Sequence, residues 1–339
     1  MRPKLLELNM IAKWNHFLQT GKIPRPIAIE GPPGGGKTTI VEDVCVNKLG
    51  IGHIEKHAPT MLVEDFGVPD MLGTSSTFGY RLPDWFPFEG RTDIPEYGVV
   101  VFDDSNQCDA DNQKVIANIE QARTLHGVPM KKGWWVIRTG NRTTDGAGAN
   151  KILTHLRNRE TKLELETHLQ DWTDWAIDHG VKPVVISFIQ FRPSLLHDFD
   201  PKRDVNPTPR SWVEGVSDSI GVVPPETEFE EFMGAVGEGA SAEFKGFLDI
   251  ERKLPNPESI IRSPDTANVP TDPATCYALC GALAERADVD NFKNIVKYGD
   301  RMKPEFSVLL VSYASRKNAD LQETEAFTQW ATRNQDVLF

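Results

Sequence analysis

The sequence predicts an α/β fold, in which a parallel sheet is flanked by helices, followed by an α-helical second part. Two continuous apolar runs, Ile27–Ile29 and Val99–Phe102, are typical of strands that are buried on both faces of a parallel sheet. A glycine-rich turn follows the first run and opens directly into a segment whose apolar residues recur at helical spacing. We therefore expect an α/β core over residues 1–168 and a helical region over residues 169–339.

The length and charge of the chain limit its function. Its 339 residues suggest two domains, at about 150 residues per domain. Lysine and arginine number 37 against 49 for aspartate and glutamate, which gives a net charge of −12 and makes nucleic acid an unlikely partner. No apolar run is long enough to span a bilayer, and charges interrupt the N-terminal segment. We therefore expect a cytoplasmic protein without a membrane segment.

The first predicted element is an amphipathic helix over residues 4–19. Its apolar residues lie three or four positions apart and predict one packed face: Leu5, Leu8, Ile11, Trp14 and Leu18. Gly21 and the prolines at positions 24 and 26 end this helix before the first strand.

The turn after the first strand predicts a phosphate-binding loop. Gly31, Gly36, Lys37 and Thr38 fit the pattern of a glycine, four residues, and then glycine, lysine and a hydroxyl residue. Glycines let consecutive N–H groups surround a phosphate, and the helix that follows presents the positive end of its dipole. We expect Lys37 to reach the β and γ phosphates and Thr38 to hold Mg²⁺. The predicted nucleotide-binding residues are Gly31, Pro32, Pro33, Gly34, Gly35, Gly36, Lys37, Thr38 and Thr39.

Other residues that could bind metal show no matching pattern. His53 and His57 are four apart, which is a ligand spacing on a helix, but residues 50–57 are predicted to form a strand. We interpret both as ordinary surface or packing residues. The cysteines show no CxxC pairing and are expected to be buried free thiols, with a metal site as the lesser alternative: Cys45, Cys108, Cys276 and Cys280.

Residues 58–95 predict a long irregular region that is rich in aromatic side chains. Such long loops inside a compact domain are usually functional or mobile. Either the aromatic residues pack under the domain, or some of them contact a partner or substrate: Phe66, Phe78, Tyr80, Trp85, Phe86 and Phe88.

Two adjacent carboxylates end the second apolar run. Asp103 follows this strand directly and is expected to help hold Mg²⁺. Asp104 stands where a catalytic base or a water-positioning carboxylate belongs. An acidic turn after a core strand is common by itself, but its combination with the phosphate loop favours a nucleotide-hydrolysis site.

Three further elements complete the predicted core. A helix over residues 111–124 precedes a buried strand at residues 134–138, and Asn141 follows at the carboxyl edge of the sheet, where it could touch the γ-phosphate or the attacking water. A short helix then leads to Arg157 and Arg159, and residues 162–166 alternate as a strand. These arginines either form surface ion pairs or reach the nucleotide site of a neighbouring subunit as arginine fingers.

The rest of the chain predicts helices. Residues 169–179 form one that stops at Gly180, and Pro183 begins another. Thr208 and Pro209 predict a helix start, which fixes Arg210 in the first turn. Arg210 is either a surface charge or a phosphate contact, for which a guanidinium is well suited.

The motifs in this order resemble those of the AAA+ ATPases, in particular the MoxR-like branch: GPPGGGKTT, VVVFDD, RTGNR, LRNR and TPRSW. The resemblance covers nearly the whole chain. It implies Walker A at residues 31–38, Walker B at Asp103 and Asp104, and sensor one at Asn141. It also implies Arg159 as the preferred finger and Arg210 as sensor two. Two departures stand out: Asp104 replaces the usual glutamate, and Glu160 replaces the aromatic residue that generally follows the finger, which leaves Arg157 as an alternative.

The resemblance further implies an α-helical lid and C-terminal extension over residues 169–339, and an ATPase that uses ATP and Mg²⁺. It implies a ring, expected to be a homo-hexamer, that remodels a protein client, and the family is commonly paired with a von Willebrand factor A-domain protein. Two other functions remain open. One is a nucleotide-gated binding scaffold with little hydrolysis, and the other is a motor or loader linked to nucleic acid.

Overall fold

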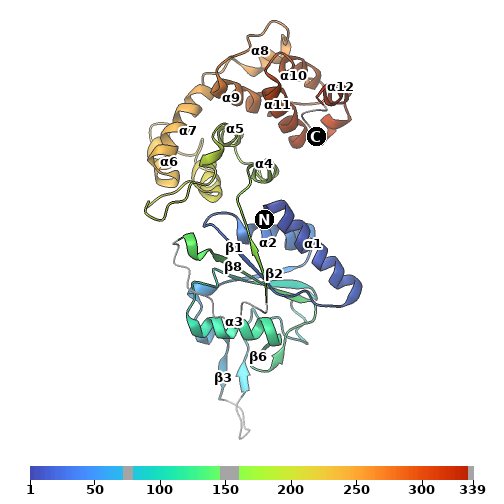
Figure 1. Cartoon of the computed structure of the whole chain (residues 1–339), viewed down its shortest axis with the longest axis vertical. Helices are drawn as coiled ribbons and strands as arrows, with labels where there is room; N and C mark the ends of the chain where they lie inside the picture. Colours follow the sequence, from blue (N-terminus) through green and yellow to red (C-terminus); the bar gives the residue numbers. More distant parts are fainter. Residues whose placement is uncertain (72–78, 146–159, 335–339) are drawn as a thin grey trace. The chain divides into compact units, whose positions relative to one another are not determined.

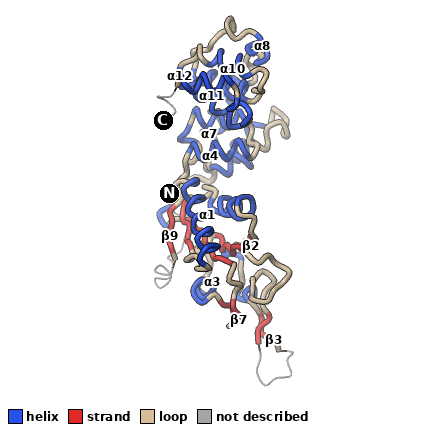
Figure 2. Tube along the Cα trace, turned by 90° about the vertical axis from the view of Figure 1, so that its right-hand side faces the viewer, coloured by secondary structure: helices blue, strands red, loops and turns tan. Residues whose placement is uncertain are grey.

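The computed structural model describes residues 1–71, 79–145 and 160–334. The chain divides into two compact units, Met1–Thr167 and His168–Phe339, and each is described by itself. The first unit contains the strands and the second is built from helices joined by loops (Figures 1 and 2).

A five-stranded parallel sheet forms the centre of the first unit, in the order β2-β5-β8-β1-β9. β8 lies between β1 and β5, and its register places Asn141 opposite Gly31. The carboxyl ends of β1, β5 and β8 therefore meet at one edge of the sheet. The strands are β1 (Ile27–Gly31), β2 (Gly52–His57), β5 (Gly98–Asp103), β8 (Trp134–Asn141) and β9 (Thr161–Glu164).

Helices cover both faces of this sheet (Figure 1). Two clusters of buried apolar side chains include residues of the strands and of these helices. Because successive side chains of a strand point to opposite faces, β8 sends Trp135 and Ile137 to one cluster and Trp134 and Val136 to the other. The first cluster includes residues of α1 and α2, and the second includes residues of α3. These helices are α1 (Pro3–Thr20), α2 (Lys37–Asp43), which continues as a π-helical turn (Val44–Lys48), and α3 (Ala110–Ala122).

The buried face of α1 differs from the predicted one. Leu5, Leu8 and Leu18 are about half exposed, whereas the buried side chains of this helix are Leu6, Met10, Trp14 and Phe17. Trp14 and Phe17 contact each other and the ring of Tyr97, which precedes β5. Both faces of the helix carry apolar residues at helical spacing, so the aromatic partner determines which face is buried.

Residues 58–95 pack mainly against the second apolar cluster. Phe66, Trp85 and Phe86 are buried and Phe88 is partly buried, which favours the packing interpretation for these four residues. Tyr80 is 43% exposed and stacks on His126, and Phe78 lies outside the described residues. The region contains two 3-10 turns (Ala58–Thr60 and Val63–Phe66) and the antiparallel pair β3 (Val68–Asp70) and β4 (Gly79–Arg81). A second short pair follows α3, β6 (Thr124–Leu125) and β7 (Val128–Pro129).

The second unit is helical in its described residues. Its core contains Phe188, Trp212 and Phe244, whose rings contact one another. The helices are α4 (Leu169–Asp178), α5 (Pro183–Phe191), α6 (Glu228–Val236), α7 (Glu238–Glu251), α8 (Pro257–Arg262), α9 (Pro273–Ala284), α10 (Phe292–Gly299), α11 (Pro304–Lys317) and α12 (Glu325–Arg333), with a π-helix at Ser211–Ser217 and 3-10 turns at Pro193–Leu195 and Ala319–Glu323. The predicted fold class, a helix-flanked parallel sheet followed by helices, is confirmed.

Two other expectations concern the whole chain. All four cysteines are buried and free, as predicted, and burial raises the pKa of Cys45 to about 12. Among the described helices, none combines the length and the apolar character that crossing a bilayer requires.

Candidate nucleotide site

The predicted phosphate loop connects β1 to α2. β1 ends at Gly31 and α2 begins at Lys37. Gly34 and Gly36 adopt left-handed backbone conformations, with φ of 68° and 82°, which side chains other than glycine rarely accept. Gly31 is required for another reason, because a Cβ there would lie 2.9 Å from the carbonyl oxygen of Leu165. The glycines of the motif thus allow both the turn and its close approach to the end of β9.

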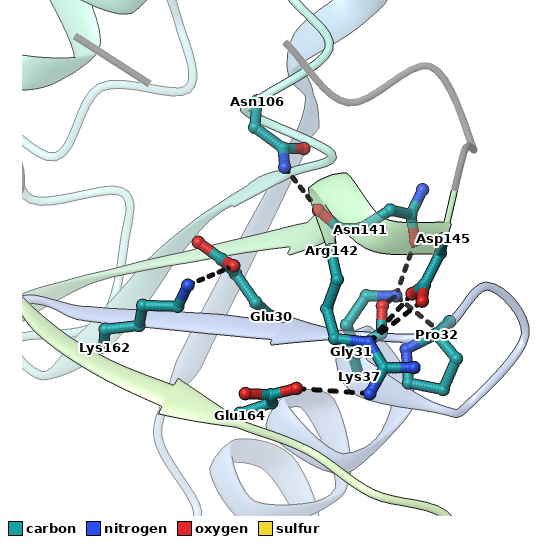
Figure 3. A network of polar contacts seen from close by, with 10 residues as sticks. All are labelled: Glu30, Gly31, Pro32, Lys37, Asn106, Asn141, Arg142, Asp145, Lys162 and Glu164. Carbon is teal, nitrogen blue, oxygen red and sulfur yellow. Dashed lines mark hydrogen bonds and ion pairs between the residues drawn. The ribbon is translucent and has the colours of Figure 1, made fainter. Parts of the chain in front are cut away.

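The side chain of Lys37 is buried and lies inside this loop. Its Nζ donates hydrogen bonds to the carbonyl oxygens of Gly31 and Pro32, at 3.1 and 3.0 Å, and to Oδ1 of Asn141, at 2.9 Å (Figure 3). Lys37 and Asn141 are 104 positions apart in sequence. The parallel pairing of β1 with β8 brings them together.

Asp103, at the end of β5, accepts hydrogen bonds from two hydroxyl groups. Thr38 Oγ1 donates to Oδ1 of Asp103 at 2.6 Å, and Thr139 Oγ1 donates to the same oxygen. Burial raises the pKa of Asp103, but the hydrogen bonds from Thr139 and Thr38, together with the neighbouring His57, outweigh burial and hold the pKa below its ordinary value. An ionised carboxylate beside a hydroxyl is a donor set that suits Mg²⁺. Thr38 and Asp103, the two predicted metal ligands, therefore lie together.

Asp104 follows in a left-handed conformation, with φ of 48°, which aspartate tolerates better than most residues. Its backbone N–H donates to Thr139 Oγ1 at 3.2 Å. Its carboxylate lies within 4.8 Å of ligand atoms of both Asp103 and His57.

The structure places two residues at this site that the sequence interpretation missed. His57 ends β2 and is exposed, and its Nδ1 lies 3.6 Å from Oδ2 of Asp103. Thr139 lies in β8, and its hydroxyl group donates a hydrogen bond to Asp103. The signal for His57 was available, because two parallel strands that end in polar residues place them side by side. The helical spacing of His53 and His57 does not reveal this placement, because both residues lie in a strand.

Hydrogen bonds hold both the backbone and the side chain of Asn141. Its carbonyl oxygen accepts a hydrogen bond from Asn106 Nδ2 at 2.6 Å, while its side chain contacts Lys37 (Figure 3). Gly140 leaves room for this contact, because a Cβ there would lie 2.6 Å from Asn106 Oδ1. The end of β8 is therefore fixed at the edge of the sheet where the phosphate loop lies.

A buried group of charges lies on the other face of β8. Arg138 Nε lies 2.8 Å from Oε1 of Glu120 in α3, and the guanidinium also binds Glu160. All three side chains are less than 5% exposed. Burial raises the pKa of Glu120 to about 7, although Arg138 opposes this rise. Glu160, one of the two departures from the AAA+ pattern, thus has a structural partner inside the core.

The remaining predicted residues lie elsewhere. Arg157 and Arg159 fall outside the described residues. Arg210 belongs to the second unit, where its side chain is 62% exposed and lies 3.9 Å from Glu214. Pro33, Gly35 and Thr39 keep their predicted places in the loop and in the first turn of α2.

Comparisons with known proteins give only distant matches. No family model and no curated protein match the chain. Among solved structures, a RuvB mutant from Thermotoga maritima aligns at 13% identity and a TM-score of 0.39, over 86% of this chain and 84% of that one. NtrX from Brucella abortus aligns at 14% identity and a TM-score of 0.38, over 91% and 68%. Hsp104 with ATPγS and FITC-casein aligns at 13% and 0.38, over 52% of this chain and only 36% of that one. Similarities at this level assign no function.

Proposed function

We propose that the chain is a magnesium-dependent ATPase. The proposal rests on one observation: the buried amine of Lys37, the amide of Asn141 and the Thr38–Asp103 pair meet at one edge of a parallel sheet, around a glycine-rich loop. This combination of a cation, a carboxylate with a hydroxyl, and a loop of backbone N–H groups suits a nucleoside triphosphate with a divalent cation.

Each group has a defined task in this proposal. The N–H groups of residues 34–39 bind phosphate oxygens, and Lys37 exchanges its bonds to the loop carbonyls for bonds to the β and γ phosphates. Thr38 and Asp103 hold Mg²⁺, which neutralises the charge on the phosphates when it is bound. Asn141 orients the γ-phosphate or the attacking water, and Asp104 accepts a proton from that water or positions it.

We further infer that the chain is an AAA+ ATPase of the MoxR-like type. The order of the motifs supports this inference, as does the division into an α/β unit and a helical unit. The inference includes a ring, expected to be a hexamer, in which Arg159 or Arg157 acts on a neighbouring subunit and Arg210 contacts nucleotide. Hydrolysis would remodel a protein client, with a von Willebrand factor A-domain protein as the first candidate.

The direct test uses Lys37→Ala. This change removes a charge from the phosphate loop and no apolar packing, so the variant should keep its fold by circular dichroism. It should lose most of its affinity for a fluorescent ATP analogue and its release of phosphate from ATP. Lys22→Ala is the matched control, because this lysine is exposed in the loop before β1. Unchanged binding and turnover in Lys37→Ala would disprove the assignment.

A nucleotide-gated scaffold is the second candidate, and Asp104 favours it. Aspartate is one methylene shorter than the glutamate that AAA+ proteins usually carry at this position, so its reach to an attacking water is reduced. Tight ATP binding by the wild-type protein with turnover near zero would select the scaffold. A gain of turnover in Asp104→Glu would then identify the shorter side chain as the cause.

A further inference from the structure

Three functional groups from two neighbouring strands converge beside the phosphate loop. His57 ends β2, and Asp103 and Asp104 end β5 and follow it. One ligand atom from each of the three residues lies within 4.8 Å of the other two, and His57 Nδ1 lies 3.6 Å from Asp103 Oδ2. The strand pairing fixes this arrangement, because His57 is the register partner of Asp103.

These separations match a shared metal ion. Ligands bound at about 2.1 Å in an octahedron lie about 3 Å apart when adjacent and about 4.2 Å apart when opposite. The imidazole of His57 is 48% exposed and the Asp103 carboxylate is 19% exposed, so both can be reached from solvent. Small side-chain movements would place all three groups around one ion.

The nitrogen ligand changes which ion the site prefers. Mg²⁺ binds oxygen ligands almost exclusively, whereas Mn²⁺, Co²⁺ and Zn²⁺ also accept imidazole, with affinities that rise along this series. A phosphate-loop site completed by Thr38 and Asp103 alone offers only oxygen atoms. His57 adds a ligand that selects a transition metal.

We propose that His57 is a direct ligand of the divalent cation at this site, and that it raises the affinity of the site for transition metals such as Mn²⁺ relative to Mg²⁺. This inference rests on the proposed nucleotide site, because Thr38 and Asp103 supply the oxygen ligands. If His57 only formed a hydrogen bond with Asp103, its imidazole would not contact the cation.

Pulsed electron paramagnetic resonance of Mn²⁺ provides the test. A directly bound imidazole gives a ¹⁴N coupling, whereas a histidine that only bonds a carboxylate ligand gives a much weaker one. The whole chain is measured with Mn²⁺ alone and with Mn²⁺ and ADP, in wild type, His57→Gln and His53→Gln. His53 is the matched control, because it lies on the same face of β2, four residues earlier.

The expected result is a strong ¹⁴N coupling in wild type and His53→Gln and its loss in His57→Gln. The Mn²⁺ affinity of His57→Gln should fall about tenfold or more, while its Mg²⁺ affinity changes little. A wild-type spectrum without this coupling, or a coupling that persists in His57→Gln, overturns the inference. Binding of a fluorescent ADP analogue, measured on the same samples, separates this outcome from a failure of the nucleotide site itself.

Discussion

At the scale of single residues, the site depends on side chains with narrow steric or chemical tolerance. Gly34 and Gly36 allow the loop to turn, and Gly140 allows Asn106 to reach the peptide of Asn141. Asp104 has the least usual backbone of the predicted catalytic residues that the structure describes, with its φ of 48°. If the Asp104 carboxylate supports hydrolysis, the protein is an ATPase, and if it does not, the protein is a nucleotide-gated scaffold.

Asp104→Asn should therefore bind ATP and hydrolyse it at least about a hundredfold more slowly than wild type, because the amide keeps the shape and accepts no proton. Asparagine also tolerates the left-handed backbone, so the fold should be unchanged. The measurements are phosphate release and retention of ATP after gel filtration. Asp111→Asn, in an exposed pair with Lys114 at the start of α3, is the control. Normal turnover in Asp104→Asn would mean that the base lies elsewhere.

The glycine-rich loop lies between a strand and a helix, as the sequence predicted, whereas some residues that lie beside it were not predicted. The loop residues are contiguous, and each has a chemical requirement that can be recognised locally. Thr139 and His57 reach Asp103 only through the pairing of β5 with β8 and β2. Their roles depend on strand order, which local patterns do not give. Arg138 likewise belonged to a predicted buried strand, but its partners are Glu120 in α3 and Glu160, which immediately precedes β9.

At the scale of elements, the strands of the five-stranded sheet and the helices α1, α3 and α4 were predicted with close bounds, but the buried face of α1 was not. α1 was expected at residues 4–19 and spans Pro3–Thr20. Its leucines that were expected to be buried are exposed, and Leu6 is buried instead. When a helix carries apolar residues on more than one face, its own sequence does not determine which face is buried, and the element that packs against it does. The contacts of Trp14 and Phe17 with Tyr97 supply that partner.

The buried charges around β8 yield a stability prediction for the first unit. Glu160→Gln removes one of the two negative partners of the Arg138 guanidinium and should lower the free energy of unfolding by about 3 kcal/mol. Lys162→Ala breaks the pair of Lys162 with Glu30, where the lysine is 57% exposed, and should cost less than about 1 kcal/mol. Urea unfolding followed by tryptophan fluorescence measures both. Equal losses of unfolding free energy in the two variants would show that burial does not strengthen the contribution of the Arg138–Glu160 pair to stability.

The helical unit contains a carboxylate whose titration can be followed. Glu228 in α6 is buried and accepts hydrogen bonds from Arg252, at 2.8 and 2.5 Å, and from Lys245, at 2.9 Å. Arg252 is the main reason that the pKa of Glu228 is lowered to about 2. The folded pKa is below the ordinary value of 4.5, so the stabilisation is complete above pH 4.5 and is lost as the pH falls through 2.

Glu228→Gln should accordingly destabilise the helical unit by about 2 kcal/mol at pH 7, and this difference should shrink as the pH is lowered below 4.5. Calorimetric melting of both proteins between about pH 7 and pH 3 measures the effect. Glu243→Gln serves as the control, because Glu243 pairs with Arg192 at the surface, where both are nearly half exposed. A difference that does not depend on pH would assign the effect to packing instead.

At the scale of the whole molecule, the proposal requires more than one copy of the chain. The candidate nucleotide site lies within Met1–Thr167 and consists of a lysine, an amide, two hydroxyl groups, two carboxylates and a histidine. A second positive charge that acts only in the transition state would complete it, and an adjacent copy can supply this charge as an arginine. Arg159, and Arg157 as its alternative, are the candidates that the sequence offers.

Arg159→Ala should bind ATP nearly as well as wild type and hydrolyse it about a thousandfold more slowly, since a finger acts on the transition state and not on affinity. Arg159→Ala and Lys37→Ala are each expected to be inactive alone. Mixed assemblies contain some interfaces with an intact loop and an intact finger, so mixing should restore part of the activity. Arg157→Ala, treated in the same way, identifies which arginine acts. Mixed assemblies without any recovery would refute action between subunits.

The alternation of side chains along β8 also affects which sequence changes the protein can tolerate. Arg138 and Gly140 face α3 and Asn106, while Thr139 and Asn141 face Asp103 and Lys37. Deletion of one residue before Arg138 would exchange these two sets, so that a guanidinium entered the phosphate side and a hydroxyl met the two buried glutamates. Such a shift cannot be repaired by a single substitution. Length changes should therefore be far rarer than substitutions in this strand during the evolution of the protein.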